Sequence, residues 1–220
     1  MRAPHALAAT CVAVSAALLL SACGGSKKDD GKIKDPGADV STSAPAPTSS
    51  SAAPSPTAAG VKRPTITLPS DAKDVFEDEH TGDPVKDAVL ADNAGYVLAM
   101  DEGVFKGTTT DNLGFYATEK GLANAISYVQ GVHDKGLVWT GTVRFFNRKV
   151  TLEGTGDASV VYCSDESKAF PKHVSTGKVD KGATTARSYV LYSTHAKKSA
   201  EGVWQTTDIV SERGSKQCQP

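Results

Sequence analysis

The chain has 220 residues, of which 24 are basic and 25 acidic, so its formal net charge at pH 7 is −1. From Ser70 onward, 17 basic residues stand against 21 acidic ones, a balance that excludes the cationic surface of a nucleic-acid-binding protein. The roughly 150 residues of this part are enough for one domain with a sizeable core.

The first 22 residues are typical of a secretory signal peptide. Arg2 precedes an apolar run from Ala6 to Leu20, and a run of about 15 residues is too short to cross a bilayer. The following stretch, Leu20-Ser21-Ala22-Cys23, resembles the lipobox of bacterial lipoproteins. This resemblance implies a diacylglyceryl group on Cys23, cleavage before it, and a lipid anchor at the extracytoplasmic face of the cell membrane. A plain secretory signal cleaved near Ala22 is the alternative.

The cysteine count agrees with lipidation. Cys11 lies inside the signal peptide, so a freely secreted form would keep Cys23, Cys163 and Cys218. An odd number leaves one thiol exposed in an oxidising compartment. A lipid on Cys23 removes that thiol and leaves Cys163 and Cys218 as a natural disulfide pair.

Residues 23–69 read as a tether. After Cys23 they contain Lys, Asp, Gly, Ser, Thr, Ala and Pro almost exclusively, with "STSAPAPTSSSAAPSPTAAG" in the middle. A segment with so few apolar side chains cannot offset the entropy lost on ordering. We therefore expect a disordered linker that holds a domain of residues 70–220 away from the membrane and towards the cell wall.

Two helices are predicted at the start of this domain. Asp83 and Pro84 form a good helix start before "VKDAVLADNAGYVLAMDEGVF", and the helix should end near Gly103 or Gly107. Its apolar residues cover so much of its circumference that the helix must be largely buried. The second helix fits "TEKGLANAISYVQGVHDKG" and closes at Gly136.

After Gly136 the residue composition changes to runs of β-branched and aromatic residues. Strands are expected over 138–152, 158–164, 187–196 and 202–212, with "EGTGD" as a hairpin loop between the first two. The apolar residues of the first strand change phase near Asn147, which indicates a bulge or bend. Helices followed by a meander of strands predict an α+β domain with helices on one face of an antiparallel sheet.

The order of these elements, together with "HDKGLVWTGTV", "VVYCSDES", "STGK" and "GVWQTTDIVSERGSKQC", resembles secreted actinobacterial lipoproteins with a nuclear-transport-factor-2-like (cystatin-like, SnoaL-type) cone domain. The likeness spans roughly Pro84 to Cys218. It implies a curved sheet around the helices and a disulfide between Cys163 and Cys218. In the chain-entropy account of cross-links, a bridge closing a loop of this length stabilises a fold by about 3–4 kcal/mol.

No catalytic residue emerges from the sequence. An isomerase or cyclase on this fold would need an acidic side chain of raised pKa in the cone, near an aromatic donor. The possible bases are Asp92, Asp157, Asp165 and Asp208, and the possible donors are Tyr96, Trp139, Tyr162, Tyr189 and Trp204. Among these, Asp92 has the most unusual position, because it interrupts the apolar stripe of the predicted helix. The ordinary interpretation is nevertheless an Asp that faces solvent or pairs with another helix.

Other sites are not supported. Ser70 and Lys73 fit the Ser-x-x-Lys of penicillin-binding enzymes, but the Ser-x-Asn element is missing. The four histidines of the domain, His80, His133, His173 and His195, show no ligand spacing, so no metal or cofactor is expected. The acidic run "DAKDVFEDEHTGD" is interpreted as a solvated lead-in to the first helix.

We therefore expect a membrane-anchored extracytoplasmic lipoprotein whose domain acts without catalysis, binding an envelope protein or a small apolar ligand or helping envelope assembly. The first alternative is an isomerase- or cyclase-type enzyme, which requires an apolar cavity with a buried carboxylate near an aromatic donor. The second is a scaffold subunit of a secretion or conjugation complex.

Overall fold

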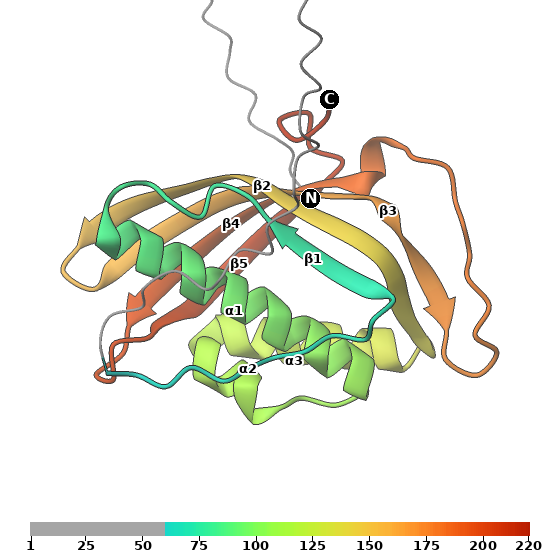
Figure 1. The fold of residues 1–220 in the computed structure, drawn as a ribbon, viewed down its shortest axis with the longest axis horizontal. Helices are drawn as coiled ribbons and strands as arrows, with labels where there is room; N and C mark the ends of the chain where they lie inside the picture. Colours follow the sequence, from blue (N-terminus) through green and yellow to red (C-terminus); the bar gives the residue numbers. More distant parts are fainter. Residues whose placement is uncertain (1–59) are drawn as a thin grey trace, which may run out of the picture. The chain divides into compact units, whose positions relative to one another are not determined.

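The computed structural model describes residues 60–220. The signal peptide, Cys23 and most of the tether lie outside the described residues. The elements follow the order β1 (Ala72–Phe76), α1 (Pro84–Lys106), α2 (Asp111–Tyr116), α3 (Glu119–His133), β2 (Leu137–Gly154), β3 (Asp157–His173), the short 3-10 helix η1 (Ala186–Ser188), β4 (Tyr189–Lys198) and β5 (Trp204–Arg213). The expected α+β class is confirmed (Figure 1).

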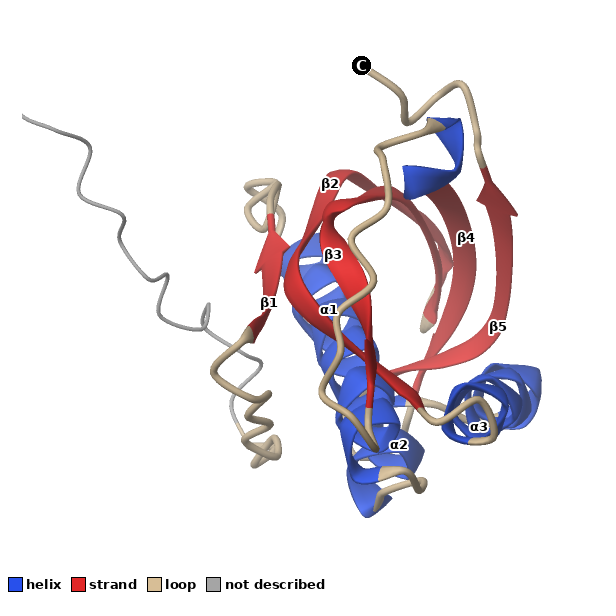
Figure 2. Ribbon diagram, turned by 90° about the vertical axis from the view of Figure 1, so that its right-hand side faces the viewer, coloured by secondary structure: helices blue, strands red, loops and turns tan. Residues whose placement is uncertain are grey.

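The sheet has five strands in the order β1-β2-β3-β4-β5. The three pairings among β2 to β5 are antiparallel, but β1 pairs with β2 in parallel, so the expectation of a purely antiparallel sheet is wrong at this edge. The reason is the connection: the chain passes through three helices between β1 and β2 and can return in the same direction. Figure 2 shows the strands curving around α1, with α3 near β5.

Helix α1 begins and ends as its sequence predicts. The Asp83 side chain accepts hydrogen bonds from the amides of Val85 and Lys86, and Pro84 occupies the first turn, where no amide hydrogen is needed. The helix ends at Gly107, whose φ of 67° is the left-handed conformation that glycine adopts without strain. Its buried positions span most of its circumference because the sheet, α2 and α3 all pack around it.

The bulge expected near Asn147 is confirmed. The register between β2 and β3 shifts between Phe146 and Lys149, and Asn147 has a φ of 52°. The shift turns Arg148 inward, where its side chain is only 4% exposed and donates a hydrogen bond to the carbonyl oxygen of Leu90 at 2.6 Å. The bulge therefore fastens the bent strand β2 to helix α1.

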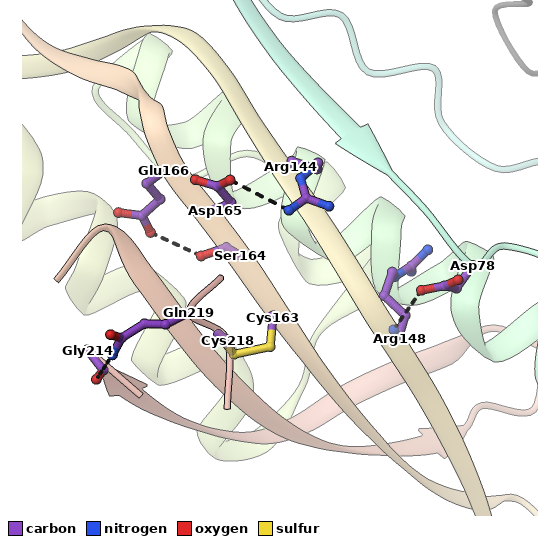
Figure 3. The surroundings of a disulfide bond; sticks show 10 residues. All are labelled: Asp78, Arg144, Arg148, Cys163, Ser164, Asp165, Glu166, Gly214, Cys218 and Gln219. Atoms are coloured by element: carbon purple, nitrogen blue, oxygen red, sulfur yellow. Dashed lines mark hydrogen bonds and ion pairs between the residues drawn. A yellow bond between two sulfur atoms is a disulfide. The ribbon is translucent and has the colours of Figure 1, made fainter. Parts of the chain in front are cut away.

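A disulfide joins Cys163, on β3, to Cys218 near the C-terminus, with 5.5 Å between the two Cα atoms (Figure 3). Both cysteines are buried, and they form a small cluster with Tyr189, Phe146 and Leu191 that is separate from the main core. The bridge thus fixes the segment after β5 against the sheet.

The packed structure extends before Ser70. Val61 and Ile66 pack against the main core, and Arg63 forms an ion pair with Asp92 of α1. Three elements are absent from the sequence-based prediction, β1, α2 and η1, and β3 runs beyond the expected end of its strand to His173. Among the helices of residues 60–220, none is both long enough and apolar enough to cross a membrane.

Candidate functional site

A cavity of about 370 Å³ lies between helices α1 and α3 and the inner face of the sheet. This is within the range of pockets that hold small organic molecules. Its wall is mostly apolar. The apolar lining residues are Val97, Met100, Val104, Val132, Leu137, Val138, Trp139, Val143, Phe145, Tyr162, Ala169, Phe170, Pro171, Tyr192 and Ile209.

Secondary-structure periodicity builds this wall. Helix α1 contributes Val97, Met100, Asp101 and Val104, which recur at the three- and four-residue spacing of one helical face. Strands β3 and β4 contribute Tyr162 and its cross-strand neighbour Tyr192, whose rings stack with centroids 5.0 Å apart. The cavity is therefore bounded by rigid elements rather than by loops alone.

One carboxyl group of α1 reaches the cavity. Asp101 is 7% exposed, and its Oδ1 accepts a hydrogen bond of 3.3 Å from the indole Nε1 of Trp139. Among the described residues, no basic side chain lies within ion-pair distance of Asp101. Burial raises the pKa of Asp101 to about 7, although the hydrogen bonds from Asp74 and Trp139 act in the opposite direction.

The carboxyl of Asp74, on β1, lies beside that of Asp101. Both carboxyl oxygens of Asp74 are buried, and no N–H group among the described residues donates to them. The available hydrogen bond is one between the two carboxyl groups, which requires that one of them carries a proton. Burial, with the neighbouring Asp101 charge, raises the pKa of Asp74 to about 9. We infer that this carboxyl pair keeps at least one proton at neutral pH and can both donate and accept a hydrogen bond at the cavity wall.

Polar residues gather at another part of the lining: Tyr128, Glu166, Thr185, Arg187, Ser188 and Arg213, which we call the rim. Arg213 donates two hydrogen bonds to Glu166, from Nη1 to Oε2 at 2.6 Å and from Nη2 to Oε1 at 3.1 Å. The hydrogen bonding with Glu166 raises the pKa of Arg213. The rim thus combines a closed ion pair with donors that face the cavity.

The four carboxylates singled out in the sequence lie outside the cavity lining. Asp92 is fully buried, so the interpretation of a solvent-facing Asp is wrong; it pairs with Arg63 and accepts from the backbone amide of Trp204 at 2.9 Å. Asp165 pairs with Arg144 at 3.6 Å. Asp157 lies 3.8 Å from His195, and Asp208 accepts from the amide of Ile209.

Two of the five possible donors, Trp139 and Tyr162, do line the cavity, whereas Tyr96, Tyr189 and Trp204 are buried elsewhere. The sequence reasoning missed Asp101 and placed Asp74 in a solvated lead-in, whereas Asp74 is a strand residue with buried oxygens. The spacing of Asp101 from Val97 and Val104 puts the three residues on one helical face, but α1 is apolar all around, so this spacing did not mark the face as a cavity wall. For Asp74 there was no signal, because nothing in its neighbourhood predicts a strand parallel to β2.

In residues 60–220, no three His, Cys, Asp or Glu side chains gather in a way that could hold a metal ion. His173 bonds to Asp180 at 2.7 Å, and His195 lies 3.3 Å from Glu153, each at the surface. The polar groups that line the cavity are carboxyl, indole, hydroxyl and guanidinium groups.

No protein-family model and no curated protein matches the chain. Among solved structures, it is similar to a ketosteroid isomerase-like protein from Erwinia carotovora atroseptica, with a TM-score of 0.40, 15% identity, and coverage of 58% of this chain and 95% of the other. It is also similar to a putative ketosteroid isomerase from Shewanella frigidimarina, with a TM-score of 0.33, 14% identity, and coverage of 58% of this chain and 97% of the other. For the intermembrane space region of the chloroplast protein ARC6, the TM-score is 0.35 and the identity 12%, and the match covers 62% of this chain and 98% of the other.

Proposed function

We propose that the protein is a membrane-anchored extracytoplasmic lipoprotein whose cone-like domain binds a small apolar molecule in the cavity under the sheet. The observation that carries the proposal is the cavity itself, with its mostly apolar wall and a few polar positions, among them Asp101 and Trp139. Ligand pockets in proteins combine these two properties: apolar area supplies affinity and a few polar groups fix orientation.

The lipobox-like stretch at Cys23 and the long polar tether support the location of this activity. The matching test is Cys23→Ser in the native host. We expect the variant to leave the membrane fraction and to lose the mass of the lipid. A variant that stayed in the membrane fraction with an unchanged mass would remove the anchoring part of the proposal and leave the cavity untouched.

The cavity is tested with a neutral fluorescent dye, N-phenyl-1-naphthylamine. The protein used is the chain from residue 23 onward with Cys23→Ser, oxidised, so that no detergent is needed. Val132 of α3 lines the cavity, and a Val132→Trp variant should fill part of it and weaken dye binding at least tenfold. Asn124→Trp, at an exposed position of the same helix, is the matched control and should bind as the parent does. Equal binding by both variants would place the dye elsewhere and contradict the proposal.

The carboxyl pair favours a second function, an acid–base enzyme of the isomerase or cyclase type. A carboxyl group whose pKa lies near neutrality can take a proton from a bound molecule and return it at another position. The test is deuterium uptake from heavy water into 2-tetralone, a small apolar ketone with an acidic C–H bond. Faster uptake with the parent than with Asp101→Asn would support catalysis. Equal rates would leave only binding.

A further inference from the structure

The rim of the cavity offers more hydrogen-bond donors than acceptors. Its only carboxylate, Glu166, is fully engaged: it accepts both bonds from Arg213 and a third, at 3.3 Å, from the hydroxyl of Ser164. Arg213 in turn donates to the backbone carbonyl oxygen of Arg187 at 2.9 Å. The negative charge of the rim is thus neutralised within the protein, by one of its two arginines.

The second arginine, Arg187, has no such partner. Its side chain lines the cavity and is exposed, and it takes part in none of the ion pairs or side-chain hydrogen bonds found in residues 60–220. Within residues 60–220, the hydrogen bonds of this residue are made by its backbone amide and carbonyl groups. A guanidinium group presents a planar set of N–H donors that matches a carboxylate, sulfonate or phosphate group. The rim therefore carries one positive charge in excess.

Two hydroxyl groups beside Arg187 point to the same ligand chemistry. The Thr185 hydroxyl oxygen accepts from the amide of Arg187 at 3.2 Å, and the Ser188 hydroxyl oxygen accepts from the amide of Thr185 at 3.2 Å. Each hydroxyl uses its oxygen as acceptor and keeps its own proton for another acceptor. The two bonds also hold η1 in one geometry, so these donors are fixed before any ligand arrives.

We propose that the ligand is an amphiphile with one anionic group, held at the rim by Arg187 together with Thr185 and Ser188, while its apolar body fills the cavity towards Asp101 and Trp139. This deepens the proposed binding function and rests on it. A cavity of about 370 Å³ suits a ring system or a single short chain. The occupant is thus a single small molecule rather than a two-chain lipid.

The experiment compares two dyes that share their aromatic rings and differ in charge: 8-anilinonaphthalene-1-sulfonate, an anion, and the neutral N-phenyl-1-naphthylamine. Both are titrated against the oxidised chain from residue 23 with Cys23→Ser. Arg187→Gln should weaken binding of the anionic dye about three- to tenfold and leave the neutral dye unchanged. Arg187→Lys should recover part of the loss, because a lysine keeps the charge without the planar donor set.

Lys149→Gln is the matched control, since it removes one positive charge from an exposed position of β2 that pairs with the exposed Val161 of β3. It should change neither titration. The same loss of anionic-dye affinity in Lys149→Gln and Arg187→Gln would overturn the proposal, because overall charge would then explain it. So would anionic-dye binding that Arg187→Gln does not weaken.

The outcomes also separate this inference from the function on which it rests. If the neutral dye binds in the cavity and the anionic dye gains nothing from Arg187, the binding function stands and the anionic class of ligand is wrong. If neither dye binds, both are wrong. Vesicles of phosphatidylglycerol test the other source of an anionic group: we expect no sedimentation of the protein with them, and Arg187-dependent sedimentation would overturn the assignment to a small molecule.

Discussion

Helix α1 carries two buried aspartates in opposite surroundings. Asp92, which is 0% exposed, receives two hydrogen bonds from Arg63, at 2.6 and 2.9 Å, and a third from the amide of Trp204. Asp101 has one indole donor, a second carboxyl beside it and an adjoining cavity. The same residue type on the same helix thus serves as an ionic cross-link in one place and as a proton-holding group in the other.

Asp92 and Asp101 differ in what compensates the loss of hydration when the carboxyl group is buried. A buried charge is tolerated when a partner charge and hydrogen bonds replace its lost hydration, as Arg63 does for Asp92. Where no cation is present, the acid keeps its proton instead, as the raised pKa values of Asp74 and Asp101 indicate. A binding site needs groups of the second kind, because a fully satisfied carboxylate has nothing left to offer a ligand.

The largest expected effect is on stability at Asp92. Asp92→Asn removes the charge that faces Arg63, which is itself only 13% exposed, and should lower the free energy of unfolding by about 3–5 kcal/mol. Urea denaturation at pH 7 measures the change. Asp165→Asn is the control, because its pair with Arg144 is partly exposed and should contribute about 0–1 kcal/mol.

If Asp101→Asn lowered the free energy of unfolding as much as Asp92→Asn does, the proposed difference between the two aspartates would be wrong. We expect Asp101→Asn to be neutral or stabilising at pH 7 and above, because an amide in this position carries no charge to bury.

The second expected effect is a dependence of stability on pH. The pKa values of Asp74 and Asp101 are raised from the ordinary value of 3.8 to about 9 and about 7, so the folded protein binds more protons than the unfolded chain between these limits. Stability should therefore be highest near pH 4 to 5 and fall as the pH rises towards 9, with a slope of up to about 1.4 kcal/mol per pH unit for each proton involved.

Urea denaturation at half-unit steps from pH 5 to pH 8.5 measures this slope. Asp74→Asn and Asp101→Asn each remove one of the two groups and should flatten the profile. A parent profile that rises with pH over this range, or variants as steep as the parent, would show that the carboxyl pair does not hold a proton.

The sequence predicted the elements whose signals are local and missed the distinction between the two aspartates. Asp83, Pro84 and Gly107 mark the ends of α1 by their own conformational preferences, and the phase change at Asn147 marks the bulge in β2. Nothing near Asp92 or Asp101 separates a cross-link from a cavity group. The partner of Asp92 lies in the segment interpreted as tether, and the neighbour of Asp101 lies on β1, which the sequence did not predict.

The face of helix α1 that borders the cavity could not be predicted either, because the helix is buried on several sides. Because α1 is covered by the sheet, α2 and α3, its apolar residues occur all around the helix, and no single stripe marks the face that borders the cavity. The polar lining residues Thr185, Arg187 and Ser188, in and beside η1, and Arg213, at the end of β5, look in a sequence like any other solvated positions. The disulfide between Cys163 and Cys218 was accessible because only a count of cysteines was needed.

The smallest expected effect concerns the bond from Trp139 to Asp101. Trp139→Phe keeps an aromatic ring beside Phe105 but removes the indole donor, and the free energy of unfolding should fall by about 0.5–1.5 kcal/mol. The indole N–H stabilises the ionised form of Asp101, so the loss should be larger at pH 8 than at pH 5, and the loss should shrink in an Asp101→Asn background. An equal loss at both pH values and in both backgrounds would mean that Trp139 contributes packing alone, and the polar position on the cavity wall would then rest on the two carboxyl groups.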